Sequence, residues 1–222
     1  MPRRLLLSAS LVACLGGMPL RATTLFTDLS SSNPPYNSSI GHAVSGSATA
    51  NGGFTEAMEF TVAGSGSKSV GQLDFAVTFS NFAATFNAAI FTVGAGKPGV
   101  QVANASWTNL PDTAEFCCSL VTVTGITGVT LTGGTSYYMV LSTSSTTASM
   151  SWDDEDNSIG VSGDRQYSNN GGVSWTDTGV INPLSAFDVL SGLATPEPAA
   201  MLSMGCALGL LATLRMRRAA RN

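Results

Sequence analysis

Short β-rich runs separated by turn-forming residues constrain the fold of this chain more than any other feature. Between Thr23 and about Leu190, no long segment shows the apolar period of an amphipathic helix. Segments rich in glycine, serine and asparagine, such as 64–67 and 169–172, divide the runs. The runs span residues 23–28, 57–62, 72–79, 88–93, 120–123, 136–142, 149–152, 173–175 and 186–190. About nine short strands at this spacing predict an all-β protein, an antiparallel, jelly-roll-like β-sandwich over residues 23–192.

Two of these runs predict how the strands are buried. From Leu73 to Phe79 every second residue is apolar, whereas Gln72 and Thr78 fall on the other parity. Because successive strand residues point to opposite faces, this strand should bury one face. The run 136–142 is apolar on both parities, so we expect it to be buried on both faces.

The charge of the central region excludes one class of partner. Between Thr23 and Thr195, three basic residues (Lys68, Lys97 and Arg165) stand against thirteen acidic ones. An acidic surface repels phosphate backbones, so we expect no nucleic-acid partner.

Residues 1–22 are typical of a secretory signal peptide that forms a short helix. Arg3 and Arg4 precede an apolar segment, 5–15, and Leu20-Arg21-Ala22 precedes a polar region, which predicts cleavage after Ala22. The secretion machinery is the partner that this segment implies. Two alternatives stay open, namely twin-arginine export through Arg3 and Arg4, and acylation of Cys14 in a lipoprotein-like box.

Residues 193–222 combine a linker, an extended spacer, an apolar helix and a basic cluster. The 16 residues from 199 to 214 carry no charge, and as a helix they would span about 24 Å, near the thickness of a bilayer core. Basic residues directly after such a run hold that end in the cytoplasm. The residues that define the pattern are Pro196, Glu197 and Pro198 in the spacer and Arg215, Arg217 and Arg218 in the cluster.

This tail resembles the bacterial PEP-CTERM sorting signal. The resemblance implies that an exosortase at the inner membrane reads the tail while the body is sorted to the cell surface or the exopolysaccharide matrix. The protein would then be held in the inner membrane by its tail as an intermediate stage before it reaches the surface. A permanent C-terminal membrane anchor is the alternative.

Six segments of the central region form a recognisable set: 57–60, 73–79, 97–99, 117–118, 133–141 and 167–175. With these segments, the region resembles the choice-of-anchor R domain of bacterial surface proteins. The resemblance implies a β-sandwich with no known catalytic residues.

A second local resemblance, to the Asp-box of sialidases, lies in the last of these segments. It predicts a hairpin in which a side-chain acceptor closes the turn, glycine supplies a positive φ and tryptophan packs beneath. The sequence holds one copy, so the pattern indicates a structural hairpin and not a glycosidase. The residues are Ser168, Asn170, Gly172 and Trp175.

Cysteines and acidic residues supply two further candidate sites. Cys117 and Cys118 are adjacent, and we expect either a vicinal disulfide or a reduced or intermolecular pair. The acidic run 153–156 predicts a solvated loop, with Asp153, Asp154 and Asp156 as candidate ligands for Ca²⁺. No other cofactor is expected.

Residues for hydrolysis are scarce, so we expect no enzyme. His42, the sole histidine, lies in a segment that reads as a Gly/Ser-rich loop, and Glu56 and Glu59 differ in parity. The sequence therefore predicts an exported, non-enzymatic structural protein of the envelope or exopolysaccharide. A carbohydrate-binding module that uses Trp107, Trp152 or Trp175 is the alternative, and an unidentified hydrolase comes third.

Overall fold

Strands make up the regular structure of the described residues, which are 22–50, 52–79, 85–111, 120–156, 158–181 and 183–192 of this computed structural model. All of them belong to one unit, Ala22–Gly192, and they contain no helix, which confirms the all-β prediction. Within them, accordingly, no helix could cross a membrane. The predicted signal segment up to Arg21 and the tail 193–222 lie outside the described residues.

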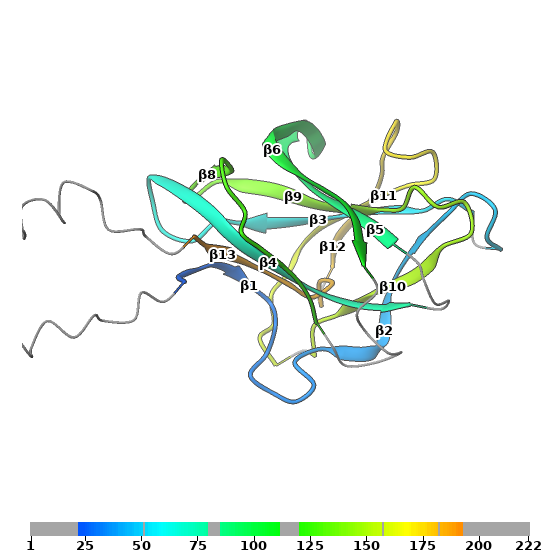
Figure 1. Ribbon diagram of the computed structural model, residues 1–222, viewed down its shortest axis with the longest axis horizontal. Coiled ribbons are helices and arrows are strands. Elements are labelled where there is room, and N and C mark those ends of the chain that lie inside the picture. The colour runs from blue at the N-terminus through cyan, green and yellow to red at the C-terminus, as the bar shows by residue number, and fades with distance from the viewer. Residues whose placement is uncertain are drawn as a thin grey trace, which may run out of the picture. The chain divides into compact units, whose positions relative to one another are not determined.

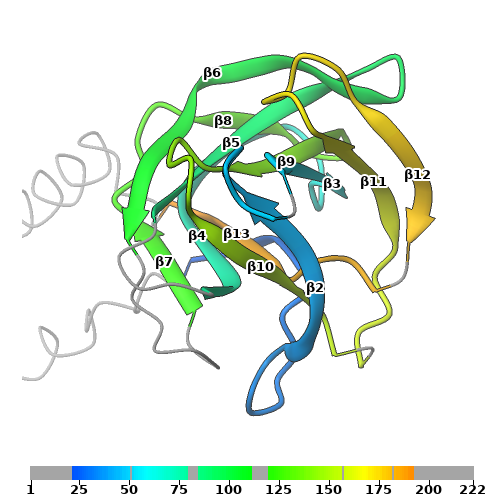
Figure 2. The same cartoon turned by 90° about the vertical axis from the view of Figure 1, so that its right-hand side faces the viewer.

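One of the two sheets has seven antiparallel strands (Figures 1 and 2). They are β1 (Thr24–Thr27), β2 (Asn37–Ser45), β4 (Ser67–Phe79), β7 (Leu120–Thr124), β8 (Thr130–Thr132), β10 (Ser149–Asp154) and β13 (Phe187–Ser191). The main order is β1-β13-β4-β10-β2, and β7 and β8 also pair with the long strand β4.

The second sheet has six antiparallel strands, in the order β12-β11-β3-β9-β5-β6. In Figure 2 this sheet curves over the other one. Its strands are β3 (Thr55–Thr61), β5 (Thr85–Gly94), β6 (Lys97–Pro111), β9 (Ser136–Ser142), β11 (Gly163–Ser168) and β12 (Thr176–Ile181). The two-layer arrangement agrees with a β-sandwich.

The partner of β4 changes in the middle of that strand. Phe75 pairs with Phe187 of β13, whereas Val77 pairs with Trp152 of β10. Ala186 lies at the junction, where its carbonyl accepts the N–H of Ala76 and its own N–H donates to the Asp153 carbonyl. The segment before β13 is therefore held against both β4 and β10, and this brings distant polar residues together.

The main core lies between the sheets, and its burial follows the sequence pattern. Leu73, Phe75, Val77 and Phe79 are at most 3% exposed, as the alternation on β4 predicts. The prediction that the other face is exposed is wrong in the middle of the strand, because Asp74 and Ala76 are buried as well. Strand β9 is buried on both faces, which confirms the second burial prediction. Trp152 is fully buried, and its ring lies 5.5 Å from that of Phe187.

Several predicted boundaries are wrong for physical reasons. The run 173–175 is part of the turn between β11 and β12 and is not a strand. Strands β2, β6, β8, β11 and β12 were not predicted, because their many Gly, Ser, Thr and Asn residues give little local strand signal. Pairing with distant strands decides their structure instead.

Candidate functional site

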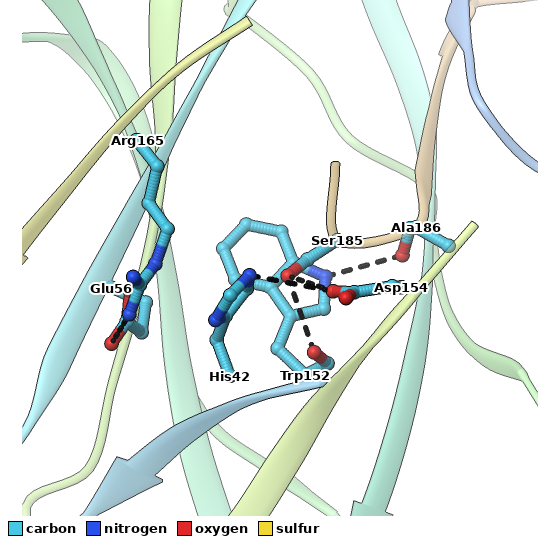
Figure 3. A network of polar contacts seen from close by, with 7 residues as sticks. All are labelled: His42, Glu56, Trp152, Asp154, Arg165, Ser185 and Ala186. Carbon is cyan, nitrogen blue, oxygen red and sulfur yellow. Dashed lines mark hydrogen bonds and ion pairs between the residues drawn. The ribbon is translucent and has the colours of Figure 1, made fainter. Parts of the chain in front are cut away.

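Five polar side chains gather on the core side of the strands next to Trp152 (Figure 3). Glu56 lies opposite Leu141, and Arg165 lies opposite Met58, both of which are core residues. His42 of β2 lies opposite Trp152 itself. We call the set of His42, Glu56, Asp154, Arg165 and Ser185 the inner polar network.

Glu56 and Arg165 form a two-pronged ion pair within this network. Arg165 Nε and Nη2 donate to the two carboxylate oxygens of Glu56 at 2.9 and 3.0 Å. The side chain of Glu56 is 2% exposed and that of Arg165 is 18% exposed. Burial raises the pKa of Glu56 to about 7, although the Arg165 guanidinium opposes this change. The guanidinium also lies 5.7 Å from the ring centre of Tyr167.

Asp154 stands between His42 and Ser185. Its Oδ1 lies 3.5 Å from His42 Nε2 and accepts a 3.2 Å hydrogen bond from Ser185 Oγ. Burial and the nearby Arg165 lower the pKa of His42 to about 4, so the imidazole is neutral at pH 7. Burial raises the pKa of Asp154 to about 6. His42 lies in β2 rather than in a loop, which corrects the sequence interpretation.

The order of these three groups differs from that of a hydrolytic triad. In a triad, histidine lies between the serine and the acid, so that it can take the hydroxyl proton. Here the hydroxyl of Ser185 faces Asp154 and also contacts the Trp152 carbonyl at 3.2 Å. Ser185 is also fully buried. The arrangement holds β10 and the residues before β13 together, and it does not activate a nucleophile.

The acidic run 153–156 is not the solvated loop that the sequence predicts. Asp153, Asp154 and Glu155 are at most 3% exposed, because the residues before β13 pack against them. Asp156 alone of the four is partly exposed. It accepts hydrogen bonds from Ser30 at 2.6 Å and from Ser32 at 2.5 Å. Hydrogen bonds from Ser158 and from these two serines hold its pKa well below the ordinary value.

The structure does not bring the three predicted calcium ligands together. Asp153 accepts a hydrogen bond from Thr78 Oγ1 at 2.5 Å, Asp154 faces Ser185, and Asp156 faces the two serines. In the described part of the chain, no three His, Cys, Asp or Glu side chains are grouped as a metal site would require.

A second set of carboxylates has no cationic partner. Asp28, Asp153, Glu155 and Asp188 each have one buried oxygen that lacks a hydrogen-bond partner. Burial raises the pKa of Asp28 well above its ordinary value, and it raises the pKa of Asp153 and of Asp188 to about 6. We call these four residues the unpaired acidic group. Sequence reasoning missed Asp28 and Asp188, since each is a lone acid at a strand end or within a strand.

The predicted hairpin lies between β11 and β12. Ser168 Oγ accepts the N–H of Gly172 at 2.8 Å, and Asn170 Oδ1 accepts the N–H of Ser174 at 2.9 Å. Gly172 has φ +88°, a value that glycine adopts readily. Trp175 packs against a small cluster of Ala57, Tyr138 and Val140. These bonds close the turn locally.

The three tryptophans do not form one platform. Trp152 lies in the core, and Trp107 packs against the same core from β6. Trp175 packs instead against the separate cluster on the other face of the six-stranded sheet. Cys117 and Cys118 lie in segment 112–119, and the predicted sorting residues lie in 193–222. Both segments are outside the described residues.

The fold and the site together define an all-β protein of two antiparallel sheets with a buried polar network. No family model, curated protein or solved structure matches this chain.

Proposed function

We propose that this chain is an exported, non-enzymatic structural protein of the cell envelope or exopolysaccharide, sorted by its C-terminal tail. A signal helix at 1–22 and a short apolar helix within 199–214 would flank the sandwich. The secretion machinery and an exosortase are its proposed partners. The tail acts as a sorting signal that the exosortase recognises at the inner membrane. The body then stays at the surface or in the matrix.

The observation that carries the proposal is the order of elements in the tail. The spacer Pro196-Glu197-Pro198 is followed by an uncharged apolar run and then by Arg215, Arg217 and Arg218. Strand β13 ends at Ser191, so the tail follows directly on the last strand of the sandwich. Residues 192–195 separate the end of this strand from the spacer in the sequence.

The inner polar network supports a role without catalysis. Its serine hydroxyl is buried and bonded to Asp154, while its histidine is neutral at pH 7. A carbohydrate-binding module would need exposed aromatic rings. Trp152 is buried in the core, so its ring cannot stack on a sugar.

Fractionation of producing cells tests the sorting proposal. Three chains are compared: the full chain, a chain lacking residues 195–222, and Arg215→Gln/Arg217→Gln/Arg218→Gln. We expect the full chain at the surface or in the matrix, with a mass that shows removal of the tail. The two altered chains should be absent from that fraction.

Lys68→Gln/Lys97→Gln is the matched control, because it removes basic residues from the body and leaves the tail intact. Surface delivery of the chain that lacks 195–222 would refute the sorting role. Retention of the full chain in the inner membrane with its tail intact would favour the permanent anchor instead.

A further inference from the structure

The turn between β11 and β12 holds an Asn-Gly pair, Asn170-Gly171, which has no part in the proposed function. Both residues are exposed to solvent. Gly171 has φ +71°, and the space where a Cβ would lie is open. Glycine has no side chain to hinder the approach of its own N–H group to the side-chain amide of the residue before it. An exposed Asn-Gly pair is therefore a place where an asparagine can lose its amide nitrogen without an enzyme.

The hydrogen bonds that hold the Asn170 side chain are all local. Its Oδ1 accepts the N–H of Ser174 at 2.9 Å and the hydroxyl of Ser168 at 2.8 Å. Its Nδ2 donates to Ser174 Oγ at 2.8 Å. The hairpin continues into β12, which lies at the edge of the six-stranded sheet. Opening this hairpin breaks few bonds and leaves the main core in place, so it costs much less free energy than global unfolding.

We propose that Asn170 is a site of spontaneous deamidation, which proceeds when the hairpin opens locally. The main-chain nitrogen of Gly171 bonds to Cγ of Asn170, and the bond from Cγ to Nδ2 breaks. Nδ2 leaves as ammonia and takes up the proton of the Gly171 N–H group. Water then opens the cyclic imide on one side or the other, which gives aspartate or isoaspartate at position 170. Water is the sole co-reactant, and the reaction does not depend on the sorting proposal.

The two products differ in what they do to the hairpin. Aspartate keeps side-chain oxygens that accept from Ser168 and from the Ser174 N–H, and it loses the Nδ2 donor. Isoaspartate adds one carbon to the main chain, which displaces the Gly172 N–H from Ser168 Oγ. Trp175 packs on a cluster that is separate from the main core, so the damage stays within the hairpin.

Peptide mapping of the full chain tests the site. The folded chain is incubated at pH 8 and 37 °C and is then digested with chymotrypsin, which cuts after Tyr167 and Trp175 and releases residues 168–175. Mass spectrometry locates the product, and a sample digested without incubation gives the background. We expect conversion at Asn170 and none at Asn169, which is also exposed but does not precede glycine. A peptide that stays unmodified would overturn the proposal.

Two serine variants test whether opening of the hairpin controls the reaction. Ser168→Ala removes one hydrogen bond to Asn170 and the acceptor for the Gly172 N–H, so the hairpin opens more often. We expect conversion at Asn170 to become about fivefold faster. Ser106→Ala, an exposed position on β6, is the control and should convert at the wild-type rate. A wild-type or slower rate in Ser168→Ala would overturn control by opening.

The residue after Asn170 gives a test of the chemistry itself. Gly171→His hinders the attacking nitrogen, and histidine is among the residues that adopt a positive φ most often. We expect conversion at Asn170 to be roughly tenfold slower in this variant. A rate equal to that of wild type would exclude attack by the Gly171 nitrogen and overturn the proposal.

A comparison in guanidinium chloride keeps the test decisive if a variant does not fold. In the denatured wild-type chain, Asn170 and Asn51 should convert at similar rates, because both precede glycine. In the folded chain, we expect Asn170 to convert more slowly than in the denaturant. Equal rates at Asn170 in the two conditions would show that the hairpin has no control over the reaction, and would overturn the proposal.

Discussion

The inner polar network and the unpaired acidic group both contain buried carboxylates, but they differ in how these carboxylates are satisfied. In the network, Glu56 has Arg165 on both of its oxygens, and Asp154 has Ser185 and His42. In the acidic group, the carboxylates receive main-chain N–H groups and hydroxyls but no cation. Burial alone therefore does not decide how a carboxylate is satisfied. Among these acids, Glu56 has a cationic partner in Arg165, whereas Asp154 has a hydroxyl and a neutral imidazole.

The largest expected effect comes from removing the cation of the network. Arg165→Met keeps most of the side-chain volume but leaves Glu56 as a buried acid without its partner. Loss of one member of a buried pair typically costs about 3–5 kcal/mol. We expect a decrease of this size in the free energy of unfolding of the full chain, measured by urea denaturation.

Lys97→Met is the control for this experiment. Lys97 is exposed at the start of β6, so its replacement should change the free energy of unfolding by less than about 0.5 kcal/mol. If the two variants were equally stable, the distinction between a paired and an unpaired acid would lose its basis.

The pH dependence of stability provides a second, smaller test, because Glu56 and His42 act in opposite directions. The raised pKa of Glu56, about 7, contributes stability that is fully present below about pH 4.5 and is lost as the pH rises through 7. The lowered pKa of His42, about 4, contributes stability that is present above pH 6.5 and is lost as the pH falls through 4. Between pH 5 and 6.5, the two contributions oppose each other.

Two variants should therefore change the slope of stability with pH in opposite senses. Relative to wild type, Glu56→Gln should gain stability as the pH rises from 5 to 6.5, whereas His42→Gln should lose it. We expect differences of about 1 kcal/mol per pH unit, measured by urea denaturation in EDTA. Slopes that changed in the same sense would contradict the opposing roles.

The smallest expected effect is at the hairpin, where the buried polar group is neutral. Ser168→Ala removes the acceptor for the Gly172 N–H, and we expect a loss of about 1 kcal/mol. Ser174→Ala is the control in the same turn, and its effect should be less than half as large, since Ser174 is exposed. A loss at Ser168 as large as that at Arg165 would show that charge is not what separates the regions.

The sequence predicts the parts of the fold that have a local pattern. The alternation from Leu73 to Phe79 marks the buried face of β4, and the opposite parities of Glu56 and Glu59 place one on the core face and the other beside Tyr138. Strand β2 has no such pattern, because its Gly and Ser residues resemble a loop. Its strand structure depends on β10, about a hundred residues further along the chain.

The sites were harder to predict, since their partners are distant in sequence. The density of charge in 153–156 suggests exposure, but contacts with Thr78 and Ser185 bury this segment. The carboxylate of Asp28 accepts the N–H of Phe187, a residue 159 positions further along the chain. The hairpin at Ser168–Trp175 could be predicted, because all of its bonds span four residues or fewer.

The position of β13 between β1 and β4 sets the order in which this chain can fold. The first strand of the described region has the last strand as its sheet partner, so β1 stays without its ladder until residues 187–191 are available. Pairing between strands so far apart in sequence is slow. In a chain that is synthesised from its N-terminus, β1 has no sheet partner until β13 has been made. The seven-stranded sheet is therefore complete only after residues 187–191, the last strand of the described region, have paired with β1 and β4.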